Sequence, residues 1–144
     1  MKILVVEDSS TIKKIIKSTV NSMGYDNVLE ADDGLEAMDI LNANPDINLV
    51  ITDKNMPNMD GMELLELITS NHALSKVKIV MITGESAKGD IHDALDMGVA
   101  DYIIKPVTQQ MLKDKLTPIF ESIKASSDGL NQLNDYIASL KASI

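Results

Sequence analysis

The chain has 144 residues, 44% of them hydrophobic, and its 13 basic and 22 acidic side chains give a formal net charge of −9. This length supports one domain with a substantial core, and the absence of cysteine excludes disulfides and thiolate metal ligands. The negative charge repels nucleic-acid phosphates. The apolar run Ile3–Val6 is too short for a signal peptide or a membrane span. We therefore expect a cytoplasmic protein with no membrane insertion and no nucleic-acid partner.

Strand and helix patterns alternate along the sequence. Short apolar runs indicate five strands, near residues 2–6, 25–31, 49–53, 77–82 and 100–104. The segments that follow them have apolar residues at helical spacing, and Asp33 and Asp60 are typical helix caps. In the helix after Asp33, Leu35, Met38 and Leu41 are predicted to face the core. Five strands alternating with five helices indicate an α/β fold: a doubly wound, five-stranded parallel sheet with helices on both faces.

Polar residues stand where four of these strands end. Glu7 and Asp8 follow the first strand, and Asp53 ends the third. Thr83 follows the fourth strand and Lys105 the fifth. Because parallel strands deliver their carboxyl ends to the same edge of a sheet, these residues are expected to share one cleft.

Three carboxylates in one cleft repel one another, and they either raise a pKa or bind a cation. The donors are all oxygen, which favours a hard divalent ion such as Mg²⁺, with Mn²⁺ as the alternative. Asp8 and Asp53 are predicted as direct metal ligands, with Glu7 acting through a water. The backbone carbonyl of Asn55 completes the expected set.

Lys105 and Thr83 fit the other half of a phosphoryl site. An ammonium neutralises a phosphoryl group, and a hydroxyl donates a hydrogen bond to its oxygen. Asp53 is the predicted phosphoryl acceptor, since a carboxylate can form an acyl phosphate when a cation screens the incoming anion. Each residue alone also has an ordinary interpretation as a cap, a turn residue or a solvated lysine. Their joint position favours the phosphoryl site.

Four motifs together resemble the receiver domain of two-component response regulators. They are E-D at Glu7, D-K-N-M-P-N-M-D-G from Asp53, T-G at Thr83 and Y-I-I-K-P from Tyr102. The resemblance covers residues 1–124. It implies the strand order 2-1-3-4-5, a histidine kinase as phosphodonor and Asp53 as the acceptor. It also implies a cis peptide bond before Pro106.

The resemblance further implies residues that switch conformation on phosphorylation and residues that set the lifetime of the phosphoryl group. Thr83 and Tyr102 match the switch residues of the family, and they imply a downstream protein target at the face of the fourth helix, fifth strand and fifth helix. Asn55 and Glu85 occupy positions that tune how long the phosphoryl group survives. They resemble the pairing in chemotaxis-type regulators, which implies a short-lived phosphoaspartate. Glu7 stands where many receivers have aspartate.

Residues 125–144 are predicted to be a linker and an amphipathic helical extension. The sequence S-S-D-G from Ser126 indicates the linker, and an apolar stripe follows at steps of three and four: Leu130, Leu133, Ile137, Leu140 and Ile144. Two heptads do not form a stable coiled coil alone. The stripe is therefore expected to pack on the receiver, which is favoured, on a second copy as a homodimer, or on a partner. Pro118 is expected to kink or restart the preceding helix.

The favoured function is a stand-alone response regulator that signals by phosphorylation-dependent protein binding with a chemotaxis or motor-type output, and that is not a classical enzyme. A phosphorelay intermediate or phosphate sink is the alternative. A Mg²⁺-dependent phosphotransferase or phosphatase is disfavoured, because no second acid follows Asp53 by two residues. A flavodoxin-like FMN carrier is disfavoured, because the chain has no tryptophan and Glu7 and Asp8 repel phosphate.

Overall fold

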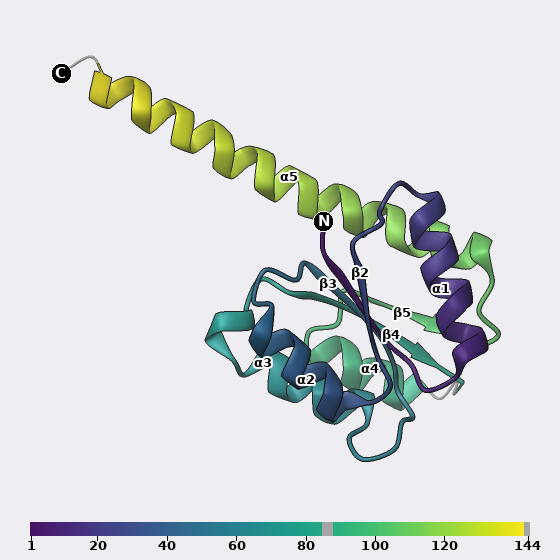
Figure 1. The fold of residues 1–144 in the computed structure, drawn as a ribbon. Coiled ribbons are helices and arrows are strands. Elements are labelled where there is room, and N and C mark those ends of the chain that lie inside the picture. Colours follow the sequence, from purple (N-terminus) through teal and green to yellow (C-terminus); the bar gives the residue numbers. More distant parts are fainter. Residues whose placement is uncertain (85–87, 143–144) are drawn as a thin grey trace.

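The structure, a computed structural model, describes residues 1–84 and 88–142, and the side chains of these residues except at 88–91 and 127–132. Its centre is a parallel sheet of five strands in the order β2-β1-β3-β4-β5 (Figure 1). The strands are β1 (Ile3–Val6), β2 (Val28–Ala31), β3 (Leu49–Asp53), β4 (Lys78–Thr83) and β5 (Asp101–Ile104). The predicted sheet and its strand order are confirmed.

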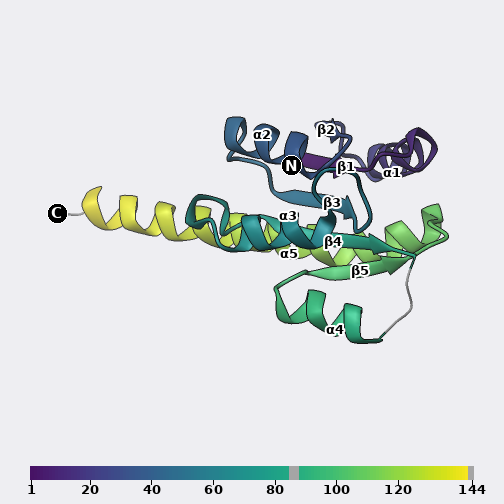
Figure 2. The ribbon, with the colours of Figure 1, turned by 90° about the horizontal axis from the view of Figure 1, so that it is seen from below.

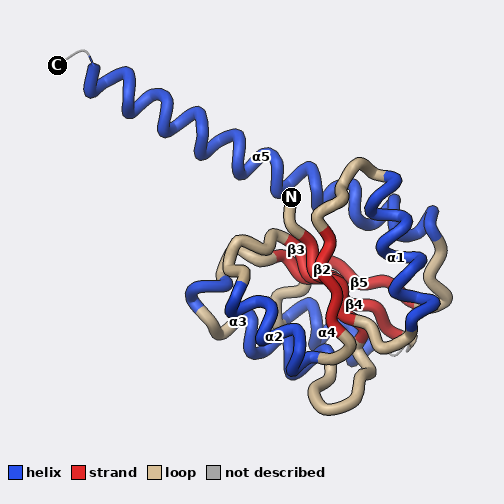
Figure 3. Tube along the Cα trace, in the orientation of Figure 1, coloured by secondary structure: helices blue, strands red, loops and turns tan. Residues whose placement is uncertain are grey.

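Helices cover both faces of the sheet (Figures 2 and 3). The helices are α1 (Ser10–Ser22), α2 (Gly34–Ala43), α3 (Gly61–Thr69), α4 (Lys88–Asp96) and α5 (Gln109–Ala142), with a short 3-10 helix at His72–Leu74. Buried residues of α1 and α5 pack with one set of strand side chains, and those of α2, α3 and α4 pack with the opposite set. The result is a three-layer sandwich.

Alternation along the strands creates the two halves of the core. In β1, Leu4 points to the layer of α2 and α3, whereas Ile3 and Val5 point to the layer of α1 and α5. All residues of β1 and β3 are buried, as expected for central strands of a parallel sheet. Each buried aliphatic side chain contributes roughly 1.5–3 kcal/mol of transfer free energy. The core thus fixes the position of the strand that ends at Asp53.

Side-chain caps start the helices where the sequence predicts. The hydroxyl of Ser9 accepts from the amide of Ile12, and the carboxylate of Asp33 accepts from the amide of Glu36. Asp60 caps α3 in the same way. These bonds satisfy amides that have no partner inside the helix.

One predicted core position is wrong. Leu35 is 51% exposed, whereas Ala37 and Leu41 are fully buried. The buried residues of the helix are Gly34, Ala37 and Leu41, so its buried face is rotated by about one residue from the predicted one. Small residues at 34 and 37 allow a close approach, which leaves the leucine at 35 on the solvent side.

The predicted break near residue 125 is also wrong, because α5 runs without interruption from Gln109 to Ala142. Pro118 lies inside it. The first half of α5 packs on the receiver, and the rest projects past the start of β1 into solvent (Figure 1). Lys124, where this part begins, still lies over the Tyr25 ring, 5.3 Å from its centre. The side chains of residues 133–142 are all exposed, so for these described residues the favoured packing on the receiver is not observed. We call residues 124–142 the α5 overhang.

The described part of the chain has no helix that combines the length and the apolarity needed to cross a membrane.

Gly61 lets the loop after β3 fold back on Asp53. A Cβ at residue 61 would lie 2.4 Å from the carbonyl oxygen of Asp53 and 2.9 Å from the Cα of Lys54. Backbone atoms cannot move aside cheaply, so we expect Gly61→Ala to destabilise the fold by about 1–3 kcal/mol, measured by urea unfolding. Gly84→Ala is the matched control, because a Cβ there meets nothing within 4 Å. Equal effects of the two substitutions would contradict this close-packed turn.

Candidate phosphoryl-acceptor site

The acidic site lies at the carboxyl edge of the sheet. Glu7 and Asp8 follow β1, and Asp53 is the last residue of the neighbouring strand β3. One carboxylate oxygen from each of the three lies within 4.8 Å of the others. Glu7 and Asp53 are 1% and 2% exposed, whereas Asp8 is exposed. The predicted cluster is therefore formed, with one acid open to solvent.

A lysine approaches the buried aspartate from the edge strand. The Nζ of Lys105 lies 3.0 Å from Oδ2 of Asp53, with the Asp53 side chain 3% exposed and that of Lys105 30% exposed. Lys105 reaches this point because its backbone amide donates to the carbonyl of Thr83, which continues the pairing of β4 with β5. Thr83 itself is buried at the end of β4. All five predicted residues thus stand at this edge.

Burial makes the acidic cluster electrostatically unfavourable. Desolvation raises the pKa of Glu7 from 4.5 to about 7, and the charge of Asp53 acts in the same direction. The amide of Ser9, which donates to Oε1 of Glu7 at 3.1 Å, and the charge of Lys105 oppose the rise. The other oxygen of Glu7, Oε2, is buried with no hydrogen-bond partner. This site therefore has unsatisfied acceptor capacity.

These residues fit a hard divalent cation. Carboxylate oxygens are the donors that Mg²⁺ prefers, and the unsatisfied Oε2 of Glu7 can accept a bond from a metal-bound water. Asn55 stands two residues after Asp53, and its backbone amide lies 3.4 Å from Oδ1 of Asp53. Receivers bind Mg²⁺ in an acidic pocket of this kind, and the cluster here has the chemistry for it.

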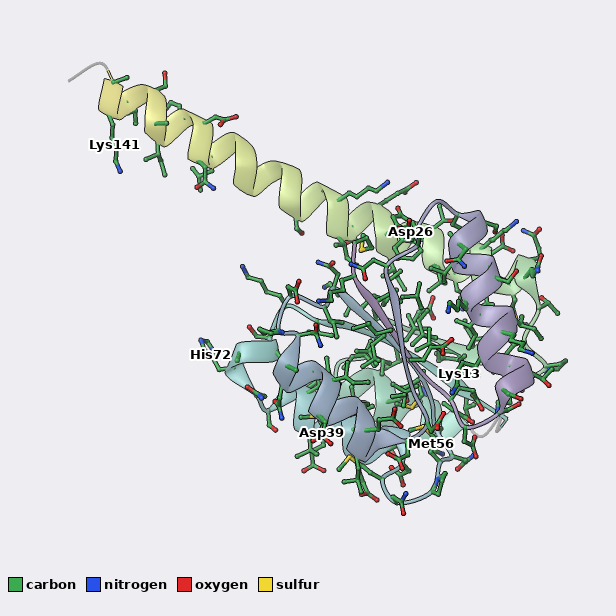
Figure 4. The ribbon with its side chains drawn as sticks, viewed as in Figure 1. Lys13, Asp26, Asp39, Met56, His72 and Lys141 are labelled. Atoms are coloured by element: carbon green, nitrogen blue, oxygen red, sulfur yellow. The ribbon has the colours of Figure 1, made fainter. Side chains whose placement is uncertain are left out.

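The loop after Asp53 is tied down at several points. The amide of Lys54 donates to the carbonyl of Ile82 at 2.8 Å, and that of Gly61 donates to the carbonyl of Lys54 at 2.8 Å. Asn58 has φ 67°, a left-handed conformation that asparagine tolerates. Its side chain donates to Asp33 at 2.7 Å, which joins the loop to the start of α2. Met56, labelled in Figure 4, belongs to this loop.

Tyr102 lies on β5, next to an ion pair that sequence reasoning missed. The Nζ of Lys115 in α5 is 5.1 Å from the centre of the Tyr102 ring and 3.3 Å from Oδ1 of Asp101. A cation at this distance attracts the face of an aromatic ring. The sequence positions of Asp101 and Lys115 do not predict this contact, because the contact depends on how α5 lies against β5. The Lys105–Pro106 peptide bond is cis, as the resemblance implied. Glu85 lies outside the described residues.

The match to a known family agrees with this geometry. Residues 3–117 match the response regulator receiver domain. The chain therefore belongs to the response regulator receiver family and is a signalling receiver of two-component systems.

Its relatives are chemotaxis regulators. The chain is 48% identical over 116 residues to the chemotaxis protein CheY1 of Helicobacter pylori. The aligned region covers 81% of this chain and 94% of the relative. The chain is 46% identical over 119 residues to a CheY homolog of Campylobacter jejuni, covering 83% of this chain and 92% of that protein. These similarities place the chain among chemotaxis-type response regulators, and they do not favour the small-substrate enzyme or the FMN carrier.

A solved structure has the same fold. The CheY of a CheX-CheY-BeF3-Mg complex from Borrelia burgdorferi has a TM-score of 0.78 and 26% identity, over 83% of this chain and 89% of that one. Vibrio cholerae CheY4 has a TM-score of 0.75 and 27% identity, over 82% of this chain and 97% of that one.

The charge repulsion around Glu7 predicts a stabilising substitution. Glu7→Gln keeps the shape, removes one buried charge and lets an amide donate toward Asp53. The pKa of Glu7 is about 7 in the folded protein and 4.5 in the unfolded chain, so as pH rises between these values the unfolded chain releases the proton first and the folded state loses stability. Above pH 7 the full cost is present. We expect Glu7→Gln to stabilise the metal-free protein by about 1–3 kcal/mol at pH 8, measured by urea unfolding in EDTA.

The same substitution should reduce the gain in stability on adding Mg²⁺, because it removes a charge next to the cation. At pH 5 the difference between the two proteins should shrink, since Glu7 is then largely protonated when folded. A Glu7→Gln protein less stable than the parent at pH 8 in EDTA would contradict the repulsion.

Proposed function

We propose that Asp53 accepts a phosphoryl group from the phosphohistidine of a histidine kinase. The observation that carries this proposal is the Lys105 ammonium 3.0 Å from the Asp53 carboxylate, next to two further acids. A lysine alone would hold Asp53 in a simple ion pair. The additional acids make the site suited to a cation, and with a cation the carboxylate can receive an anion.

In the transfer step, an oxygen of Asp53 attacks the phosphorus and forms a P–O bond as the P–N bond to the kinase histidine breaks. The imidazole leaves with the electron pair of that bond and takes up a proton. Lys105 neutralises charge on the transferred group, and the hydroxyl of Thr83 donates a hydrogen bond to it. Hydrolysis returns the carboxylate of Asp53 and inorganic phosphate.

The proposed metal site consists of Asp8 and Asp53 as direct ligands, the backbone carbonyl of Asn55, and Glu7 acting through a water. Mg²⁺, or Mn²⁺ in its place, would supply charge neutralisation between the carboxylates and the phosphoryl oxygens. The CheX-CheY complex from Borrelia burgdorferi, which contains both BeF3 and Mg, supports this assignment.

Signalling follows from a shift between two arrangements of the switch residues. A phosphoryl group draws the hydroxyl of Thr83 toward it, and the vacated space admits Tyr102. The contact of the Lys115 ammonium with the Tyr102 ring stabilises the other arrangement, in which Tyr102 has not moved into that space. The surface of α4, β5 and α5 then changes and binds a downstream protein. Asn55 and Glu85 are proposed to tune the lifetime of the phosphoryl group, as in short-lived chemotaxis-type regulators.

Removal of the acceptor should abolish phosphorylation. Asp53→Asn has no carboxylate nucleophile, so incubation with acetyl phosphate or phosphoramidate and Mg²⁺ should give no acyl phosphate by intact-protein mass spectrometry. Asp39→Asn is the control, because it removes the same charge from an exposed position on α2 (Figure 4). EDTA should reduce labelling of the parent protein to background. Labelling of Asp53→Asn at the parent rate would overturn the acceptor assignment.

Loss of the switch hydroxyl should separate phosphorylation from its readout. Thr83→Ala keeps Asp53 and Lys105, so we expect phosphorylation to persist while the response of Tyr102 weakens. The chain has three tyrosines, so fluorotyrosine labelling gives three ¹⁹F resonances that Tyr→Phe substitutions can assign. Phosphorylation should shift the Tyr102 resonance in the parent and shift it less in Thr83→Ala. A full Tyr102 shift in that variant would show that the hydroxyl is not the link.

A further inference from the structure

The α5 overhang exposes an apolar stripe on a regular helix. Leu133, Tyr136, Ile137 and Leu140 are 53%, 62%, 40% and 47% exposed. At 1.5 Å per residue the overhang extends about 28 Å beyond the receiver, and Lys141 marks its far end in Figure 4. The 116 residues aligned with the Helicobacter pylori relative make up 94% of that protein. Too little of the relative is left to contain a helix of this length, so the overhang is an addition to the receiver.

The composition of the overhang requires packing to keep it helical. It contains Gly129 together with several serines, asparagines and aspartates, which are weak helix formers. Short helices of such composition are marginal in water unless an apolar face is buried. The stripe supplies that face, since Leu133, Ile137 and Leu140 follow the heptad steps of a coiled coil. The residues that flank it are mostly uncharged.

We propose that the α5 overhang pairs with the overhang of a second copy of this chain to form an antiparallel two-helix dimer. The flanking charges favour a second copy over other occupants. A basic face for an anionic membrane is absent, because Lys124 and Lys141 are balanced by Asp128 and Asp135. The whole chain has net charge −9. Along the stripe, however, two overhangs meet with little like-charge repulsion.

The antiparallel direction follows from the fold. Leu112, Leu116 and Ile119, which pack on the receiver core, lie on the same heptad stripe as the exposed residues. A parallel partner helix on that face would therefore run into the receiver. An antiparallel partner places its own receiver at the far end of the overhang.

An antiparallel register centred near Asp135 sets Leu133 of one copy against Ile137 of the other. In the heptad set by Leu133, Ile137 and Leu140, positions 128 and 135 lie on the side of the helix away from the stripe, so neither places a charge in the contact.

The dimer leaves the phosphorylation site accessible. Strands run toward Asp53, and α5 returns in the opposite direction, so the overhang leaves from the amino edge of the sheet (Figures 1 and 2). A cleft of about 290 Å³ lined by Met1, Tyr25, Asp26 and Ile123, among others, lies where the overhang begins. The end of the second copy's helix would arrive beside this cleft, on the side away from the site.

Mass measurement tests the pairing. The full chain should change from 15.7 kDa toward twice that mass with increasing concentration in light scattering or sedimentation, with a dissociation constant of roughly micromolar order for so small an interface. Ile137→Asp places a charge in the stripe and should weaken association about tenfold or more. Ser139→Asp places the same charge on the exposed outer face and should leave association unchanged.

Cross-linking tests the direction, since the chain has no cysteine of its own. Near the centre, Asn134→Cys should form a disulfide between two copies. Leu140→Cys should not, because its two copies lie about 15 Å apart in the antiparallel register. The reverse pattern would overturn that register.

Three further outcomes would overturn the pairing itself: a monomer at all concentrations, a dimer that persists in Ile137→Asp, and a monomer that binds anionic vesicles through the stripe. Unchanged thermal unfolding of the receiver in each variant verifies that only association was altered.

Discussion

The repulsion among Glu7, Asp8 and Asp53 is the constraint on which the chemistry of this receiver depends. Two of these acids are almost fully buried, and one oxygen of Glu7 has no hydrogen-bond partner. Burying a charge costs free energy that only an opposite charge or a good hydrogen bond offsets. Lys105 compensates one carboxylate. The remaining negative charge suits the site to a cation, and in the function proposed above a bound cation would allow an anionic phosphoryl group to approach.

The sheet maintains this arrangement against its own repulsion. β1 and β3 are adjacent, buried along their whole length and covered on both faces, so the acids at their ends cannot separate without disrupting the core. The loop after Asp53 is fixed by a backbone bond from Lys54 to β4 and by the close approach of Gly61 to the end of β3. Stability of the hydrophobic layers therefore sustains an unfavourable polar cluster, as is common where a site is prepared for a ligand.

The sequence predicted the site better than it predicted the surface of the helices. Polar residues at the ends of apolar runs are brought together by parallel topology alone, so Glu7, Asp53 and Lys105 could be placed without side-chain detail. The exposure of Leu35 could not, because it depends on a rotation of α2 by about one residue against the sheet. The contact of Lys115 with Tyr102 depends in the same way on how α5 lies across β5. The continuous α5 was missed because serine and glycine near residue 127 favour a break, and helix continuity overrode that local preference.

One helix connects the two ends of the molecule. The first turns of α5 carry Lys115 beside Tyr102, and its last turns form the overhang on the opposite side of the sheet. If pairing of the overhangs leaves the first half of α5 unchanged, the free energy of dimerisation is the same with and without a phosphoryl group on Asp53. Dimerisation then has no influence on signalling. Pairing that tilts α5 against β5 has different free energies in the two switch states. Linkage then requires phosphorylation to change dimer affinity by the same factor that dimerisation changes the phosphorylation equilibrium. The rigidity of α5 across Pro118 thus decides whether the added helix only joins two receivers or also couples them.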